Sequence, residues 1–254
     1  EDTPVELVKT IPSWHKEMLE ATRQQDKVAR VAETSASEKA TVLKRIMKKH
    51  SRGLKPDVKL QPHQQRVVDA AGPGIRKLLY HGLGSGKTLS AIAAAEKTQQ
   101  PYGAVVPAAL RPNFAKEQDK FTDKQLASDI QSYTMLARGK KPEHTGTVIM
   151  DEAHRLRNPD TEQTRVAKQL AEATDQLYLL SGSPIVNAPA DLAPLMEMLT
   201  QETTTPEAFN EKYLKSTPVT PSLIDRWKGV TPGVVQSIKN KKKLHEALRG
   251  KVDY

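Results

Sequence analysis

One short run, residues 81–88 with the sequence HGLGSGKT, restricts the fold of this chain more than any other feature. It follows the apolar residues 78–80 and precedes an alanine-rich stretch, 87–96, that has helical character. A strand, a glycine loop and a helix form the context in which backbone N–H groups and a helix N-terminus bind phosphate. In such a loop we expect Lys87 to bind the β- and γ-phosphates of a nucleotide and the Thr88 hydroxyl to ligate Mg²⁺. The run predicts a nucleotide site formed by Gly84, Ser85, Gly86, Lys87 and Thr88.

The region around this loop alternates short apolar runs with longer helical stretches. The runs at 77–80, 104–106, 147–150 and 177–180 are expected to be strands, and 87–96 and 161–173 helices. Continuously apolar strands that alternate with helices indicate a parallel sheet covered by helices on both faces. The predicted fold class is therefore α/β, with ligands bound at the carboxyl ends of the strands.

Two further motifs follow strands of this predicted sheet. Asp151 and Glu152 follow the apolar run 147–150, where an acidic pair is costly unless a cation sits there. We expect Asp151 to hold Mg²⁺ and Glu152 to orient and deprotonate an attacking water, so that the two act with Lys87 in phosphoryl transfer. Ser181 and Ser183 follow the run 177–180, and their hydroxyls are placed to sense the γ-phosphate or to contact Glu152 and His154. ATP and Mg²⁺ are the expected cofactors.

The charge of the chain is uneven. Its 254 residues include 39 Lys and Arg and 30 Asp and Glu, a net charge of +9. Residues 1–55 carry 12 basic and 8 acidic residues, and residues 212–254 carry 10 and 3. Such basic arms favour a polyanionic partner, nucleic acid first, although lysines also simply keep exposed helices soluble.

The composition excludes cysteine chemistry and disfavours a membrane-spanning protein. The chain has no cysteine, so it has no disulfides, thiolate metal sites or cysteine nucleophile. No apolar run approaches the roughly 18 residues of a membrane span, and we expect no membrane partner.

The composition changes along the chain predict three parts: a basic helical accessory segment (1–57), an ATP-binding lobe (58–200) and a basic helical or irregular extension (201–254).

Taken in order, these motifs resemble the first RecA-like lobe of superfamily-2 helicases, and most closely the Swi/Snf-like group of double-stranded DNA translocases. The similarity is carried by residues 151–158 (DEAHRLRN), residues 181–187 (SGSPIVN) and residues 60–64 (LQPHQ). Ser183 stands where the group usually has threonine. His81 stands where cellular members commonly have alanine. In this respect the chain is similar to viral nucleoside triphosphatases of this superfamily.

The resemblance implies roles for several residues and partners. It implies adenine recognition by Gln64, coupling through His154, Ser181 and Ser183, and backbone contacts to nucleic acid near Arg111 and Tyr133. It also implies double-stranded DNA as partner and a second RecA-like lobe or partner subunit that supplies arginine fingers.

The residues after 215 are too few for a second lobe, so we expect this chain alone to bind ATP and to hydrolyse it slowly. Two alternatives remain open. One is a nucleotide-binding or structural module of a nucleic-acid assembly without turnover of its own. The other is the lobe of a DEAH-box RNA helicase, a group that differs by a Ser-Ala-Thr third motif.

Overall fold

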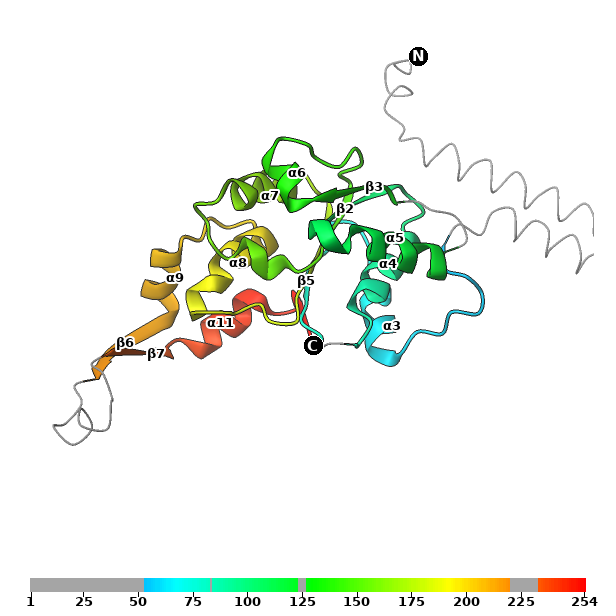
Figure 1. The fold of residues 1–254 in the computed structure, drawn as a ribbon. Helices are drawn as coiled ribbons and strands as arrows, with labels where there is room; N and C mark the ends of the chain where they lie inside the picture. Colours follow the sequence, from blue (N-terminus) through cyan, green and yellow to red (C-terminus); the bar gives the residue numbers. More distant parts are fainter. Residues whose placement is uncertain (1–52, 83, 123–126, 220–232) are drawn as a thin grey trace, which may run out of the picture. The chain divides into compact units, whose positions relative to one another are not determined.

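The computed structural model describes residues 53–82, 84–122, 127–219 and 233–254 (Figure 1). Within these residues six strands form one sheet in the order β3-β2-β4-β5-β1-β8, and every neighbouring pair is parallel. The predicted α/β fold with a parallel sheet is therefore confirmed. The strands are β1 (Arg76–Leu79), β2 (Tyr102–Val106), β3 (Ala127–Ser132), β4 (Thr147–Met150), β5 (Gln176–Leu180) and β8 (Val252–Asp253).

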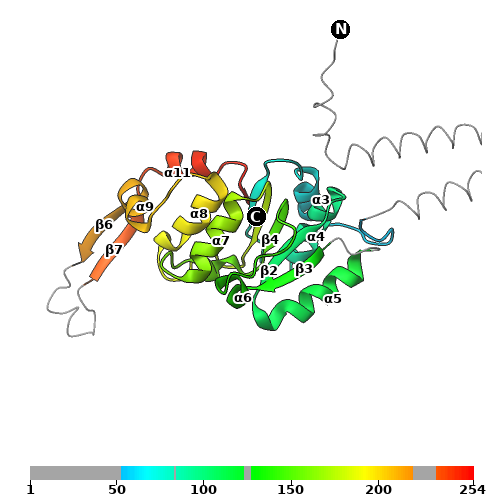
Figure 2. The ribbon, with the colours of Figure 1, turned by 90° about the horizontal axis from the view of Figure 1, so that it is seen from above.

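Helices cover both faces of this sheet, as predicted. In Figure 2, α3, α4 and α5 lie to one side of the sheet and α7 and α8 to the other. Sequence explains several helix ends: Thr161 caps α7 by accepting a hydrogen bond from the Thr164 N–H, and Ser132 caps α6 in the same way through Met135. The helices are α3 (Pro62–Asp69), α4 (Lys87–Lys97), α5 (Arg111–Phe121), α6 (Tyr133–Ala137), α7 (Glu162–Glu172), α8 (Ala193–Thr200), α9 (Pro206–Tyr213) and α11 (Lys241–Leu248).

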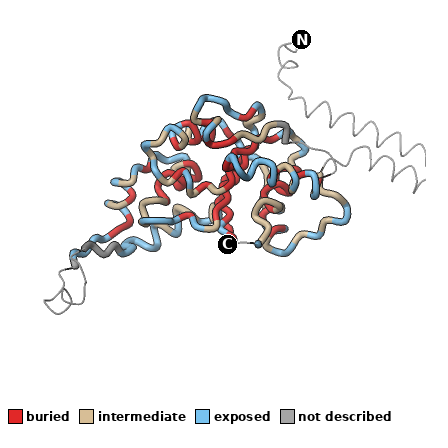
Figure 3. The backbone as a smooth tube through the Cα atoms, in the orientation of Figure 1, coloured by how far each residue is buried: buried red, intermediate tan, exposed pale blue. Residues whose placement is uncertain are grey.

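Alternate strand residues divide the core into two clusters. In β4, Ile149 packs into the cluster that includes α3, α4 and α5, whereas Val148 and Met150 pack into the cluster on the opposite face. Burial of one such side chain stabilises the folded state by about 1.5–3 kcal/mol. A strand that is buried on both faces provides about twice as much buried apolar surface as a strand with one face exposed to solvent. Figure 3 shows the buried backbone concentrated along these central strands.

The expected strands 77–80, 104–106, 147–150 and 177–180 correspond to β1, β2, β4 and β5 within one or two residues. Two further strands of this sheet, β3 and β8, were not predicted from the sequence. The β3 strand, ASDIQS, lies at the sheet edge and has no continuous apolar run. The β8 strand has two residues, too few for any periodic signal.

The chain after residue 200 contributes helix, hairpin and strand. It forms α9 and α11, a two-stranded antiparallel sheet of β6 (Leu214–Val219) and β7 (Gly233–Ile238), and finally β8 of the main sheet. Helix α11 packs on the core through Leu244, Ala247 and Leu248. The predicted N-terminal helical extension lies outside the described residues except for 53–57, and the three-part division stays a proposal. No helix in the described ranges is long and apolar enough to cross a bilayer.

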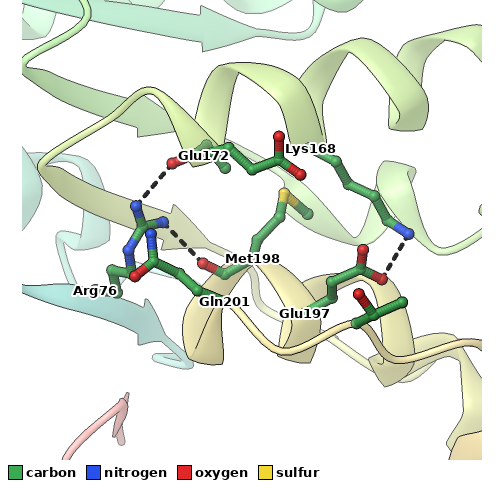
Figure 4. A pocket seen from close by; sticks show the side chains of 8 residues that line it. Arg76, Lys168, Glu172, Glu197, Met198 and Gln201 are labelled. Carbon is green, nitrogen blue, oxygen red and sulfur yellow. Dashed lines mark hydrogen bonds and ion pairs between the residues drawn. The ribbon is translucent and has the colours of Figure 1, made fainter.

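Arg76 joins two helices to the start of β1 (Figure 4). Arg76 is 7% exposed, and its guanidinium donates to the carbonyls of Ala171 and Thr174 at the end of α7 and of Met198 near the end of α8. Carbonyls in the last turn of a helix lack a helical partner and carry the negative end of its dipole. Burial lowers the pKa of Arg76, but an arginine stays charged in proteins. The side chain thus caps α7 and α8 together.

We expect Arg76→Leu to lower the free energy of unfolding by about 2–4 kcal/mol, because three carbonyls lose a charged donor in a buried place. Urea unfolding measures the change. The matched control is Arg165→Leu, because Arg165 pairs with Glu162 on the exposed face of α7 and surface pairs stabilise little. Equal losses in the two variants would show that Arg76 does not cap the helices.

Candidate nucleotide-binding site

The glycine loop connects β1 to α4 at the carboxyl edge of the sheet. Gly84 and Gly86 have positive φ angles of 75° and 76°, a region that glycine enters without strain. Gly86 is also the N-cap of α4, and a Cβ at this position would collide with the Gln64 side chain. The loop therefore packs closely against the end of the Gln64 side chain, and the left-handed backbone conformation of residue 86 explains why glycine is needed there.

Lys87 is bound to its own loop in this structure. Its ammonium donates to the carbonyl of His81 at 3.0 Å and to that of Gly82 at 3.3 Å. These neutral acceptors are weaker partners for an ammonium than phosphate oxygens. Thr88 follows at the first turn of α4 and is partly exposed, so its hydroxyl is available to a metal ion at the same place.

Helix α3 supports the loop from outside the sheet. The Gln64 amide donates to the Ser85 carbonyl at 3.1 Å, and its oxygen accepts from the Gln61 N–H at 2.9 Å. His63 Nε2 lies 3.0 Å from the same Ser85 carbonyl. Gln64 is only 5% exposed, so in this structure it braces the loop. Recognition of adenine by Gln64 stays a proposal.

The acidic pair follows β4 at the same edge. The Asp151 carboxylate accepts from the Glu152 N–H at 2.9 Å, and its residue is 9% exposed. Burial raises the pKa of Asp151 from 3.8 to about 6, with the Glu152 charge acting in the same direction and the Lys87 charge in the other. A buried carboxylate kept near the lysine of a phosphate loop is suited to a cation that arrives with its ligand.

His154 connects the acidic pair to the third motif. Its Nδ1 lies 3.2 Å from Glu152 Oε2 and 3.2 Å from the Ser181 hydroxyl. The Ser181 oxygen also accepts from the Ser183 N–H at 3.1 Å. Glu152, His154, Ser181 and Ser183 therefore form one connected set, which Asp151 joins through the Glu152 N–H.

The third motif also reaches the phosphate loop. Ser181 donates its N–H to the Leu79 carbonyl at 3.1 Å, because β5 and β1 are neighbours in the sheet. A Cβ at Gly182 would lie 3.7 Å from Lys87 Nζ. The structure thus brings together the three motifs that lie far apart in the sequence.

The donors at this edge fit Mg²⁺ carried by a nucleotide. Across the described residues no group of three or more His, Asp or Glu is placed to hold a metal ion. Mg²⁺ in nucleotide enzymes is usually bound by one or two protein oxygens together with phosphates and waters. The Thr88 hydroxyl and the Asp151 carboxylate provide that kind of partial ligand set.

The two residues expected near nucleic acid are placed differently. Arg111 is exposed at the start of α5, and its Nε donates to the Ile130 carbonyl at 2.9 Å. Tyr133 is 2% exposed and donates its hydroxyl to the Asp151 carbonyl at 2.7 Å. The Tyr133 side chain therefore supports the acidic strand end and does not face solvent, whereas Arg111 remains available to a partner.

Three supporting residues were not identified from the sequence. His63 stands beside Gln64 in the LQPHQ segment, and its position was the one available signal. Arg66 and Asp253 carry no motif, and Asp253 lies 172 residues from the loop residue that it contacts.

The lysine cluster of the basic C-terminal arm, residues 241–243, is exposed on α11. It lies next to a shallow hollow of about 540 Å³ that is lined in part by Lys241, Lys242, His245 and Arg249.

The chain is similar in sequence to proteins of the Swi/Snf-like group. Residues 125–250 match the family described as the SNF2-related domain, a range that includes the second and third motifs but not the phosphate loop. A putative ATP-dependent RNA helicase of Acanthamoeba polyphaga mimivirus is 28% identical over 151 residues, which are 58% of this chain and 34% of that protein. The Bos taurus SWI/SNF-related matrix-associated actin-dependent regulator of chromatin subfamily A-like protein 1 is 31% identical over 159 residues, covering 52% and 16%.

Among solved structures, the Sulfolobus solfataricus SWI2/SNF2 ATPase core in complex with dsDNA matches with a TM-score of 0.56 and 21% identity. The match covers 77% of this chain and 44% of that chain. The RecA-like fold and the resemblance to Swi/Snf-like proteins are thereby confirmed. The chain spans about a third or less of the length of the curated relatives given above.

We expect Asp151→Asn to raise the free energy of unfolding by about 1–3 kcal/mol at pH 8, and much less at pH 4.5. The native carboxyl binds its proton more tightly than the unfolded one, so wild-type stability falls as pH rises from about 4 to about 6 and then stays level. The asparagine variant lacks this loss. Urea unfolding at the two pH values measures it.

Asp160→Asn is the matched control, because Asp160 is exposed and its side chain makes no hydrogen bond or ion pair within the described part of the chain. This variant is expected to leave the pH dependence of stability unchanged. A pH-independent effect of Asp151→Asn would contradict the raised pKa.

Proposed function

We propose that this chain, as a relative of Swi/Snf-like ATPases, is the ATP-binding motor lobe of a translocase that moves on double-stranded DNA. The observation that carries the proposal is the convergence of Lys87, the Asp151–Glu152 pair and the Ser181–Gly182 segment at one edge of the parallel sheet. The acidic pair and the serine motif would not carry it alone, because each also occurs in ordinary helix caps and turns.

The residues divide the work of phosphoryl transfer as follows. Lys87 exchanges the carbonyls of His81 and Gly82 for phosphate oxygens, which are stronger acceptors. Thr88 and Asp151 hold Mg²⁺, and the ion supplies neutralisation of phosphate charge. Glu152 orients the attacking water and takes its proton. Positioning and charge stabilisation provide most of the rate in this chemistry.

His154 and Ser181 link hydrolysis to movement. Their contact joins the residue that handles water to a strand end that lies beside Lys87. A change at the γ-phosphate is thereby transmitted between the second and third motifs. We propose that it leads to closure against a second RecA-like lobe.

The partner lobe and the DNA rest on similarity. The match covers 44% of the SWI2/SNF2 ATPase core chain, which was solved in complex with dsDNA. An arginine finger supplied by a partner lobe raises the rate by about 10³–10⁵ in related chemistry, so we expect slow turnover when the 254-residue chain is tested without such a lobe. Arg111, exposed at the carboxyl edge of β2, is the proposed DNA backbone contact.

We expect Lys87→Ala to weaken Mg-ATP binding by about 10- to 100-fold, because a charge-assisted contact to the phosphates is lost. Isothermal titration calorimetry measures the affinity. Lys97→Ala is the matched control: Lys97 lies at the other end of α4 and also donates to two carbonyls, those of Val68 and Asp69. Equal weakening by both variants would refute the phosphate role of Lys87.

We expect Glu152→Gln to lower ATP turnover by at least about 100-fold while Mg-ATP affinity stays within about threefold, because a general base contributes 10²–10⁴ to the rate. Turnover is measured with and without duplex DNA, on this chain and on the longest protein that its gene encodes.

Strong DNA stimulation of the longer protein, with slow turnover by the 254-residue chain, supports the motor. If neither form hydrolyses ATP although both bind it through Lys87, the nucleotide is a structural or switching ligand and the motor proposal fails. Stimulation by duplex RNA in place of DNA would favour the RNA-helicase alternative.

A further inference from the structure

The last strand of the described chain touches the first residue of the phosphate loop. Strand β8 pairs with β1 over two residues, Val252 with Leu78 and Asp253 with Leu79. The Tyr80 N–H donates to the Asp253 carbonyl at 2.8 Å, which brings the Asp253 side chain beside His81. Asp253 and His81 are 5% and 4% exposed. Two residues from opposite ends of the described fold are therefore buried together at the nucleotide edge.

The Asp253 carboxylate accepts from two side chains. His81 Nε2 lies 2.9 Å from its Oδ1, and Arg66 of α3 forms a two-pronged contact of 2.8 and 3.0 Å with both oxygens. Burial acts to raise the pKa of Asp253, but the hydrogen bonds from Arg66 and His81 lower it more. The carboxylate is therefore ionised at neutral pH and bridges α3 to the loop.

The His81 ring has one polar anchor. An ionised carboxylate only accepts, so Nε2 carries the proton that forms this bond. The other ring nitrogen, Nδ1, is buried and has no hydrogen-bond partner in the described structure. The His63 ring lies edge-on to the His81 ring, with an interplanar angle of 86° and a centroid distance of 5.2 Å. Without Asp253 the ring would keep two buried nitrogens with no partner, an arrangement that proteins avoid.

The backbone of His81 meets the phosphate-binding lysine. Its carbonyl accepts the Lys87 ammonium at 3.0 Å, so the position of His81 sets where Lys87 rests and the path of the loop that follows. On the opposite side of the loop, His63 and Gln64 of the same α3 helix contact Ser85. Arg66 thus anchors Asp253 from the helix that also braces the loop.

We propose that Asp253 is a positioning residue of the nucleotide site, which holds the first turn of the phosphate loop through His81 and is itself oriented by Arg66. The proposal rests on the proposed ATP binding and adds to it a residue that contacts neither phosphate nor metal. Its consequence is that nucleotide affinity depends on a carboxylate carried by the C-terminal strand.

The test is a double-mutant cycle on the full chain with Mg-ATP as the probe, measured by isothermal titration calorimetry. We expect Asp253→Ala and His81→Ala each to weaken binding by about tenfold, and the double variant to be no more than about twofold weaker than either, because both changes remove one interaction. Asp253→Asn keeps an acceptor for His81 and should recover part of the affinity. If Asp253→Ala does not fold, Asp253→Asn takes its place in the cycle.

Lys168→Ala is the matched control, since Lys168 forms a partly buried ion pair with Glu197 at 2.8 Å on the other face of the sheet. It should lower the melting temperature and leave Mg-ATP affinity within about twofold. The proposal is overturned if Asp253→Ala binds like wild type, if the two losses simply add, or if Lys168→Ala weakens binding equally.

A second readout does not need nucleotide. Hydrogen exchange over residues 78–86 should become faster in Asp253→Ala and His81→Ala, and unchanged exchange there would overturn the proposal by itself. If wild type fails to bind Mg-ATP, the proposed function fails, while this exchange measurement still decides whether Asp253 holds the loop.

Discussion

Parallel pairing of the strands is the constraint on which the site depends. Since all six strands run in one direction, their carboxyl ends lie at one edge, and the residues that follow β1, β4 and β5 meet there. The phosphate loop, the acidic pair and the serine motif owe their proximity to this arrangement and not to nearness in sequence. Alternation along the same strands buries both faces, so the edge is held by apolar packing that the functional residues do not provide.

Without a bound ligand, the charged groups at this edge of the sheet make an unfavourable contribution to the free energy of folding. Asp151 is buried enough to raise its pKa to about 6, and Lys87 is bound to neutral carbonyls instead of a charge. Elements outside the strand ends support these groups: α3 lies under the loop, and Tyr133 donates to the Asp151 carbonyl. Favourable interactions in the surrounding structure offset the strain and the unfavourable charge at a site of this kind.

The sequence predicted those parts that depend on local chemistry. Four central strands were identifiable because both of their faces are buried, and the three motifs because glycine, lysine and carboxylate spacing is specific to phosphate chemistry. The edge strands β3 and β8 lacked an apolar run, since an edge strand is only partly covered. The contacts of Tyr133 and Asp253 could not be read from the sequence, because they join residues 18 and 172 positions apart whose pairing is set by the tertiary fold.

The turn after β4 shows how strain and coupling combine. Glu152 has φ 52° and ψ 47°, a left-handed conformation that costs a residue with a side chain about 1–2 kcal/mol. Glycine would remove the strain but also the carboxylate that contacts His154. His154 Nδ1 lies at 3.2 Å from both Glu152 and Ser181, and one nitrogen cannot serve both in full. Nδ1 of His154 therefore contacts both the glutamate of its own motif and the strand end beside Lys87, so this one ring joins the second motif to the third.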